Sequence, residues 1–138
     1  MKKLLILFAL VLSSISLVAQ QTEHQHHLVI QLASGDTLEH KMLMKQLKNL
    51  QEASPTTEVE VVCHGPGLDL LVTGHTTMAA KVTEFAGKGV HFLACENTMK
   101  DRHVERSQLL PGAGTVSSAI IHIMERQEDG WSYVKAGF

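Results

Sequence analysis

The chain has 138 residues, of which 44% are hydrophobic and 19% charged, and its formal net charge is −2. This length is sufficient for one domain with a buried core and too short for two domains of ordinary size. A chain without a basic excess and with only 4% aromatic residues is not expected to bind nucleic acid.

The first twenty residues have the layout of a secretory signal peptide. Lys2 and Lys3 precede an apolar run over residues 4–12, and small and polar residues follow up to Gln20. We therefore predict a signal peptide at residues 1–20 and a periplasmic or secreted protein. An uncleaved anchor is the less favoured alternative, because the run is short for a bilayer span. No stable membrane span is expected after cleavage.

Polar, histidine-rich residues 21–27 are predicted to form a flexible lead-in. A first strand is predicted at residues 28–32, and Asp36 is expected to cap a helix over residues 38–53. Within that helix, leucines recur at the helical period and define its core face. Pro55 follows and is expected to close this unit.

A second apolar strand, residues 59–63, runs into the loop His64-Gly65-Pro66-Gly67. Gly65 and Gly67 allow positive φ and close backbone approach. Because the loop lacks the phosphate-binding fingerprints, we interpret it as a βα turn. Residues 68–72 are expected to open a short helix or to lie across the sheet. A clearer helix is then predicted around Val82, with Thr76 or Thr77 as its cap and Gly87 and Gly89 as its end.

The third apolar strand, residues 90–95, delivers a cysteine to the start of a helix predicted over residues 99–109. Asn97 and Thr98 are expected to cap that helix. A thiol at such a position is stabilised as the thiolate by the helix dipole and by free N–H groups. Cys95 is therefore the candidate for chemistry, although free cysteines are also often buried and inert.

The last part of the chain contains a loop at residues 111–114 and a brief strand at residues 115–117. A helix over residues 119–129 follows, and its apolar residues Ile120, Ile123 and Met124 are expected to face inward. Residues 131–135 alternate apolar and polar side chains, as an edge strand does.

The alternation of strands and helices predicts an α/β fold, a three-layer sandwich with a mostly parallel sheet of about five strands. Ligands in such folds bind at the carboxyl ends of the strands, where Cys63 and Cys95 both lie. If the second and third strands are neighbours, a spacing of about 5 Å brings these thiols within reach of a disulfide. If another strand intervenes, they cannot bond.

Four segments in this order resemble the DsrE/DsrF-like family: residues 61–71, 95–99, 110–113 and 126–131. The resemblance implies a flavodoxin-like domain over residues 28–138 and a link to sulfur relay. It also implies that Cys95 corresponds to the position that carries a persulfide in the sulfur-relay members. Homo-oligomers, trimers or hexamers, are expected by the same resemblance.

Two functions are open at this point. The first is a sulfur carrier or thiol-exchange protein that uses Cys95 as a persulfide-forming thiolate and has a sulfur donor or acceptor as partner. The second is a non-enzymatic, oligomeric module that binds a small anion at the same rim. The residues expected to support either site are Cys63, His64, Gly65, Gly67, Asn97 and Thr98. No metal or organic cofactor is predicted.

Overall fold

The computed structural model describes residues 25–137. The predicted signal peptide, most of the predicted lead-in and Phe138 lie outside the described residues. The described elements are β1 (His27–Leu32), α2 (Thr37–Ala53), β2 (Glu58–Cys63), the 3₁₀ helix η1 (Gly65–Leu71), α3 (Ala79–Gly87), β3 (Val90–Cys95), α4 (Glu96–Asp101), the 3₁₀ helix η2 (Arg106–Gln108), β4 (Gly114–Val116), α5 (Ala119–Glu128) and β5 (Ser132–Lys135).

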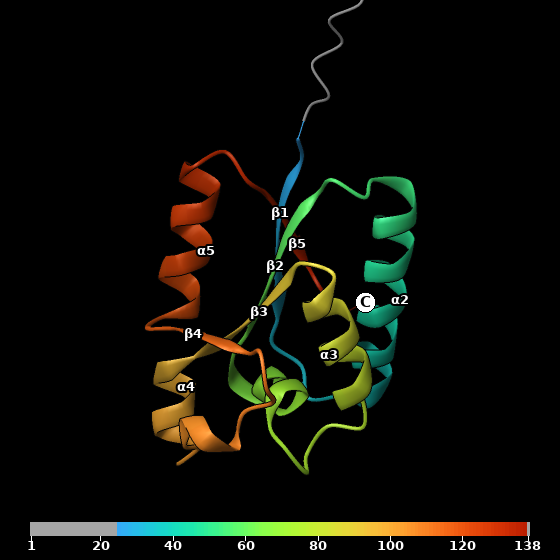
Figure 1. Ribbon diagram of the computed structural model, residues 1–138. Coiled ribbons are helices and arrows are strands. Elements are labelled where there is room, and N and C mark those ends of the chain that lie inside the picture. Colours follow the sequence, from blue (N-terminus) through green and yellow to red (C-terminus); the bar gives the residue numbers. More distant parts are fainter. Residues whose placement is uncertain (1–24, 138) are drawn as a thin grey trace, which may run out of the picture.

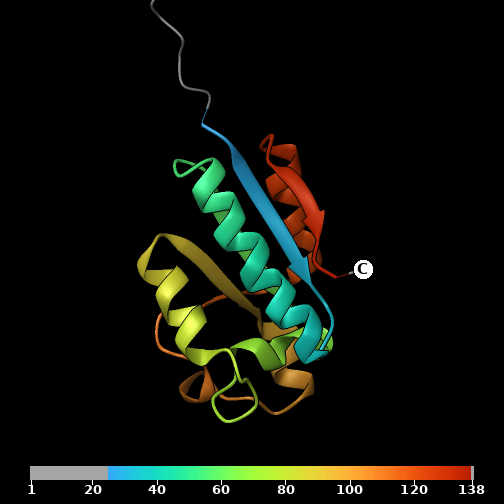
Figure 2. The ribbon, with the colours of Figure 1, turned by 90° about the vertical axis from the view of Figure 1, so that its right-hand side faces the viewer.

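The five strands form one sheet in the order β4-β3-β2-β1-β5, and every pair is parallel. Helices α2 and α3 cover one face of the sheet, whereas α4 and α5 lie on the other (Figure 1). Figure 2 shows α2 and α3 side by side in front of the sheet. The predicted three-layer α/β fold is confirmed, and β5 is the expected edge strand. No helix within residues 25–137 is long and apolar enough to cross a bilayer.

Alternation of side chains along the strands divides the core into two unequal parts. The larger part lies under α2 and α3 and contains residues such as Leu43, Val61 and Phe92. The smaller part lies under α5 and contains Val29, Val62, Cys95, Ala119 and Ile123. The two faces of the sheet therefore place neighbouring strand residues in different surroundings.

Two features expected from the sequence are present in the structure: the Asp36 cap of α2 and the close backbone approach at Gly67. The backbone N–H of Leu38 donates to the carboxylate of Asp36 at 2.8 Å, which satisfies one of the free donors at the start of α2. Residue 67 must be glycine, because a Cβ there would lie 2.3 Å from the carbonyl oxygen of Leu32. Residues 68–71 fall within η1, as a short helix.

The prediction of a helix over residues 99–109 is wrong. Helix α4 begins directly after β3 with Cys95 as its N-cap, so Asn97 and Thr98 lie inside its first turn. It ends because His103 takes a left-handed conformation (φ 53°) and Val104 N–H donates to the carbonyl of Met99 at 2.8 Å. This is the helix ending that glycine usually provides, and a histidine gives no sequence signal for it.

The prediction of inward-facing residues on the last helix is also wrong for two of the three residues. Ile123 is buried, but Ile120 and Met124 are 57% and 46% exposed. Helix α5 contacts the sheet along a narrow strip, and polar side chains occupy part of it. The lead-in is shorter than predicted, because His27 already belongs to β1 and pairs with Glu58.

Candidate functional site

The two cysteines end neighbouring strands but face opposite sides of the sheet. Cys63 pairs in register with Ala94, so Cys95 is one residue further along β3. Cys63 packs in the core under α2 and α3, whereas Cys95 packs against Ala119 of α5. Both are free thiols. The disulfide alternative fails for this reason, although the strands are adjacent as it required.

The Cys95 thiol lies where β3 ends and two helices begin. The backbone N–H of Ala119, the first residue of α5, donates to Cys95 Sγ at 3.4 Å. Burial opposes ionisation of this thiol. Hydrogen bonds from the backbone of Thr98, Ala119 and Asn97 and from the Thr98 hydroxyl outweigh that effect and hold the pKa of Cys95 below its usual value.

Thr98 is connected to the loop after β2. Its hydroxyl oxygen accepts the backbone N–H of Gly65 at 3.0 Å. A hydroxyl can accept on its lone pairs and still donate its one proton, so Thr98 can also donate to the sulfur of Cys95. Gly65 presents its N–H from a left-handed conformation (φ 51°) that favours glycine. The structure thus brings together Cys95, Gly65, Asn97 and Thr98 of the predicted site.

Cys63 does not share this site. Its side chain is completely buried, and burial among apolar groups raises the pKa of its thiol far above the usual value. Gly67 acts through the backbone, where it allows η1 to approach β1. Both residues support the fold near the site rather than contact the Cys95 thiol.

The strand register and the extended backbone of His64 place this residue on the same face of the sheet as Cys95. It continues the extended backbone of β2 past Cys63, and neighbouring strands are about 5 Å apart. Its Nε2 lies 2.8 Å from Gln31 Nε2, and the Tyr133 hydroxyl donates to Gln31 Oε1. Burial lowers the pKa of His64. Sequence reasoning missed Gln31, although a single amide inside an apolar strand is a usable signal.

A cavity of about 350 Å³ adjoins this rim, between η1 and α4. It is lined by Gly65, Pro66, Asp69, Thr98, Asp101 and Arg102. Arg102 is already engaged, with Asp69 at 2.7 Å and the Gly65 carbonyl at 3.1 Å. The cavity is lined by two carboxylates, of Asp69 and Asp101, and by one guanidinium that is already paired. This charge balance disfavours the binding of a small anion.

A buried carboxylate under α5 is a second feature that sequence reasoning missed. Glu60 is only 5% exposed and accepts hydrogen bonds from His122 (2.6 Å) and Arg126 (3.0 and 2.8 Å). Burial alone would raise its pKa, but these hydrogen bonds prevail and lower it. Arg126 also lies over the ring of Trp131 at 4.9 Å. The hydrogen bonds of Glu60 thus connect β2 to α5.

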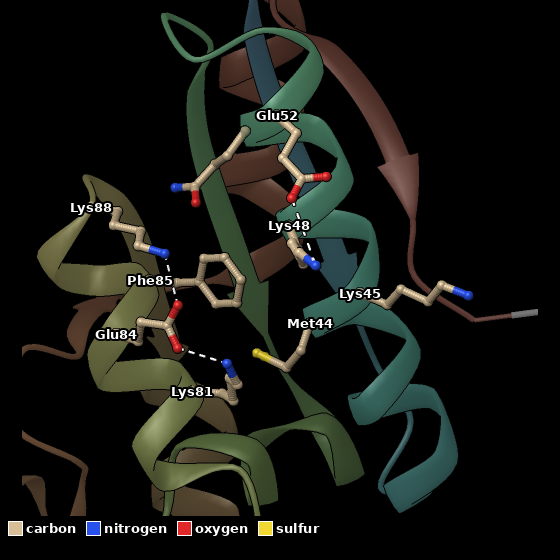
Figure 3. Close-up of a pocket in the computed structure, with 9 residues that line it drawn as sticks. Met44, Lys45, Lys48, Glu52, Lys81, Glu84, Phe85 and Lys88 are labelled. Atoms are coloured by element: carbon tan, nitrogen blue, oxygen red, sulfur yellow. Dashed lines mark hydrogen bonds and ion pairs between the residues drawn. The ribbon is translucent and has the colours of Figure 1, made fainter.

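A further cavity, of about 520 Å³, lies between α2 and α3 (Figure 3). These helices cover the face of the sheet opposite to the one on which Cys95 packs. Met44 and Phe85 line the cavity together with four lysines, two glutamates and a glutamine. Lys81 and Lys88 each donate to Glu84 at 2.7 Å. None of the predicted site residues lines it. Within residues 25–137, no group of three or more His, Cys, Asp or Glu side chains could hold a metal ion.

Comparison with known proteins places the chain in a family. A protein of unknown function from Methanobacterium thermoautotrophicum (MTH1491) has 30% identity and a TM-score of 0.78, with 80% of this chain and 99% of that chain covered. A conserved protein of unknown function from Bacteroides thetaiotaomicron (BT1422) has 17% identity and a TM-score of 0.66, covering 79% and 93%. The ychN protein from E. coli has 9% identity and a TM-score of 0.64, covering 83% and 99%.

None of the curated proteins matches the chain in sequence. The sequence model of one family does match, over residues 28–136, which is most of the chain. The chain belongs to the DsrE/DsrF-like family.

Proposed function

We propose that this protein is a sulfur carrier that takes sulfur onto Cys95 as a persulfide and passes it to an acceptor thiol. The observation that carries the proposal is the contact between Cys95 Sγ and the N–H of Ala119 at the start of α5. With the Thr98 hydroxyl, this donor favours the thiolate, which is the form that attacks sulfur.

The loading step conserves atoms and electrons. The thiolate of Cys95 attacks the outer sulfur of a donor persulfide R–S–SH, and a new S–S bond forms as the old one breaks. The products are the Cys95 persulfide and the donor thiolate R–S⁻. Delivery is the same exchange in reverse, with an acceptor thiolate as the attacking group, so no oxidant or reductant is needed.

Access to Cys95 favours small donors. The residue is only 4% exposed, since the start of α5 lies against its sulfur. We expect low-molecular-weight persulfides to load Cys95 faster than bulky disulfides react with it. Cys63, which is completely buried and whose pKa is raised, should remain unmodified in the folded protein.

Mass spectrometry after exposure to inorganic polysulfide tests this function. A gain of about 32 Da for one sulfur atom is expected on the peptide that contains Cys95, and dithiothreitol should remove it. Sulfinic acid adds nearly the same mass but resists dithiothreitol. Cys63→Ser should load like the wild type, and Cys95→Ser should not load. Absence of a reducible adduct on Cys95 would overturn the proposal.

The anion-binding alternative has less support, because the adjoining rim carries two carboxylates and its one arginine is already paired. We also propose that the protein is exported, on the basis of residues 1–20. Homo-oligomers are proposed from the family resemblance, and the exposed apolar residues Ile120, Ile121 and Met124 on α5 support such contacts.

A further inference from the structure

The cavity between α2 and α3 is formed by one face of each helix (Figure 3). The nine residues that line it are Met44, Lys45, Lys48, Gln51 and Glu52 of α2 and Lys81, Glu84, Phe85 and Lys88 of α3. Spacings of three and four residues place the members of each set on one side of their helix. All but Met44 and Phe85 are polar or charged, so the facing sides of the two helices do not close into a shared apolar contact. The volume of about 520 Å³ is within the range of small-molecule sites, about 300–1,000 Å³.

Positive charge exceeds negative charge in this cavity. Four lysines and two glutamates line it, an excess of two positive charges. Lys81 and Lys88 each donate to the Glu84 carboxylate at 2.7 Å. These hydrogen bonds hold the pKa of Glu84 at about 2, so its carboxylate is ionised at neutral pH. An ammonium group has three N–H donors, so both lysines can bind a second anionic oxygen without leaving Glu84.

Apolar surface lies directly beside these ammonium groups. Lys88 Nζ lies over the Phe85 ring, 5.4 Å from its centre. Met44 and Phe85 are only 6% and 2% exposed, so the methylene stems of the lysines supply most of the apolar surface that a ligand would contact. The methionine side chain is flexible and adapts to the shape of its neighbours. One ligand can therefore make apolar contacts and meet a positive charge at the same time.

We propose that this cavity binds a small amphipathic carboxylate, whose anionic head contacts Lys81 and Lys88 and whose apolar chain lies along the lysine stems and Met44. The excess of positive charge favours an anionic head over a cationic one. The site is separate from the function proposed for Cys95, because Met44 and Phe85 belong to the part of the core on the opposite face of the sheet.

The methyl signal of Met44 reports on occupation of the cavity, with octanoate as the probe. In purified protein labelled with ¹³C at the methionine methyls, octanoate should shift this signal in a saturable manner, and Met44→Leu identifies it. Acetate carries the charge without the chain, and octylammonium carries the chain with the opposite charge, so both should shift it far less. Absence of a saturable shift, or equal shifts with octanoate and octylammonium, would overturn the proposal. A shift confined to Met124, which is exposed on α5, would overturn it as well.

Substitutions of the charged groups should change the affinity for octanoate in opposite directions. Lys88→Gln should weaken binding about threefold, the effect of one exposed ion pair. Glu84→Gln removes a competing carboxylate and should strengthen binding. Lys100→Gln, on α4 and outside the cavity, should leave it unchanged. Equal affinities of Lys88→Gln and Lys100→Gln would show that the ammonium groups do not hold the head of the ligand.

Cys95→Ser separates this site from the sulfur-carrier function. The variant should bind octanoate as the wild type does, because Cys95 packs under α5 and does not line the cavity. Failure of Cys95 to accept sulfur would overturn the carrier function and leave the octanoate results standing. Loss of octanoate binding in a folded Cys95→Ser protein would contradict the assignment of the ligand to this cavity.

Discussion

At the scale of single residues, the surroundings of a thiol determine whether it can react. Cys63 packs within the hydrophobic core, and burial raises the pKa of its thiol without an opposing hydrogen bond. Cys95 is also buried, but hydrogen-bond donors converge on its sulfur and its pKa falls. Hydrogen bonds to charged groups are each worth about 1.5–3 kcal/mol, which is enough for a few of them to exceed the cost of burial.

Thr98→Val tests the contribution of the hydroxyl donor. Valine retains the shape of threonine but cannot donate, so the pKa of Cys95 should rise and less thiolate should be present at neutral pH. Loss of about 1.5 kcal/mol, the lower end of the range for hydrogen bonds to charged groups, corresponds to an alkylation rate about tenfold lower at pH values below the pKa of the thiol. The rates should converge at high pH, where the thiol is ionised in both proteins.

Thr77→Val, at an exposed position before α3, is the control for this substitution and should alkylate like the wild type. Identical pH profiles for Thr98→Val and the wild type would show that the hydroxyl does not stabilise the thiolate.

At the scale of elements, the close approach of η1 to β1 positions the donors of the site. Gly67 permits this approach because it has no Cβ to collide with the Leu32 carbonyl. The adjoining Gly65 can then present its N–H to Thr98. A backbone contact outside the site thus helps to determine its geometry.

Gly67→Ala should destabilise the protein, since backbone must move to accept a Cβ at 2.3 Å from an oxygen. We expect a loss of at least about 2 kcal/mol in the free energy of unfolding, measured by urea denaturation. Gly87→Ala is the matched control, because no atom lies within 4 Å of its Cβ and alanine favours the helix by about 0.5–1 kcal/mol. Equal stability of the two variants would refute the close approach.

The Glu60 cluster makes the attachment of α5 dependent on pH. The pKa of Glu60 is lowered in the folded protein relative to its ordinary value of 4.5. The stabilisation by the ionised carboxylate is therefore fully present above pH 4.5 and is lost as the pH falls through the pKa of Glu60 in the folded protein. Glu60→Gln should lower the free energy of unfolding by about 2 kcal/mol at neutral pH. The difference in this free energy between the variant and the wild type should become smaller in acid.

Chemical denaturation over a range of pH measures this difference. Glu52→Gln is the control, because Glu52 on α2 forms an exposed pair with Lys48 at 3.6 Å, and such pairs contribute about 0–1 kcal/mol. A Glu60→Gln deficit that persists unchanged in acid would contradict the assigned role.

The second and third strands could be predicted well from sequence because each contains a short apolar run between turn residues. Residues 90–95 were predicted with the observed bounds. The end of α4 could not be predicted, since His103 replaces the glycine that would announce it. The face of α5 was misassigned because His122 and Arg126 turn inward to Glu60, which no helical pattern of apolar residues reveals.

The candidate site was predicted in part. Cys95, Gly65 and Thr98 were identified from local pattern and strand order, which fix the edge of the sheet where they meet. Cys63 could be excluded from the site only once the pairing register of β2 and β3 was known. A shift of one residue along a strand moves its side chains to the other face of the sheet. The link from Tyr133 to Gln31 required the position of β5 beside β1, which chain order alone does not give.

At the scale of the whole molecule, the sheet is covered unequally. The face under α2 and α3 holds most of the core, whereas α5 buries a narrow strip and leaves Ile120, Ile121 and Met124 exposed. Exposed apolar residues gathered on one helix are typical of an interface. This asymmetry supports the proposal that copies of the chain associate through α5.

Light scattering coupled to size-exclusion chromatography measures that association. Ile120→Glu should convert the oligomer to monomer without loss of stability, because the side chain is 57% exposed in the single chain. Leu38→Glu, which changes a 54% exposed leucine on α2, should leave the oligomer intact. A wild-type protein that is already monomeric would refute the proposed association.

The central claim is that Cys95 accepts sulfur and gives it up, and transfer from the loaded protein tests it most directly. Protein treated with a small persulfide, freed of excess donor and mixed with an acceptor thiol is followed by intact-mass spectrometry. We predict that about 32 Da, one sulfur atom, leaves Cys95 as an equal amount of acceptor persulfide forms. A protein that never loads at Cys95, or that loads without releasing sulfur to the acceptor, would contradict the account.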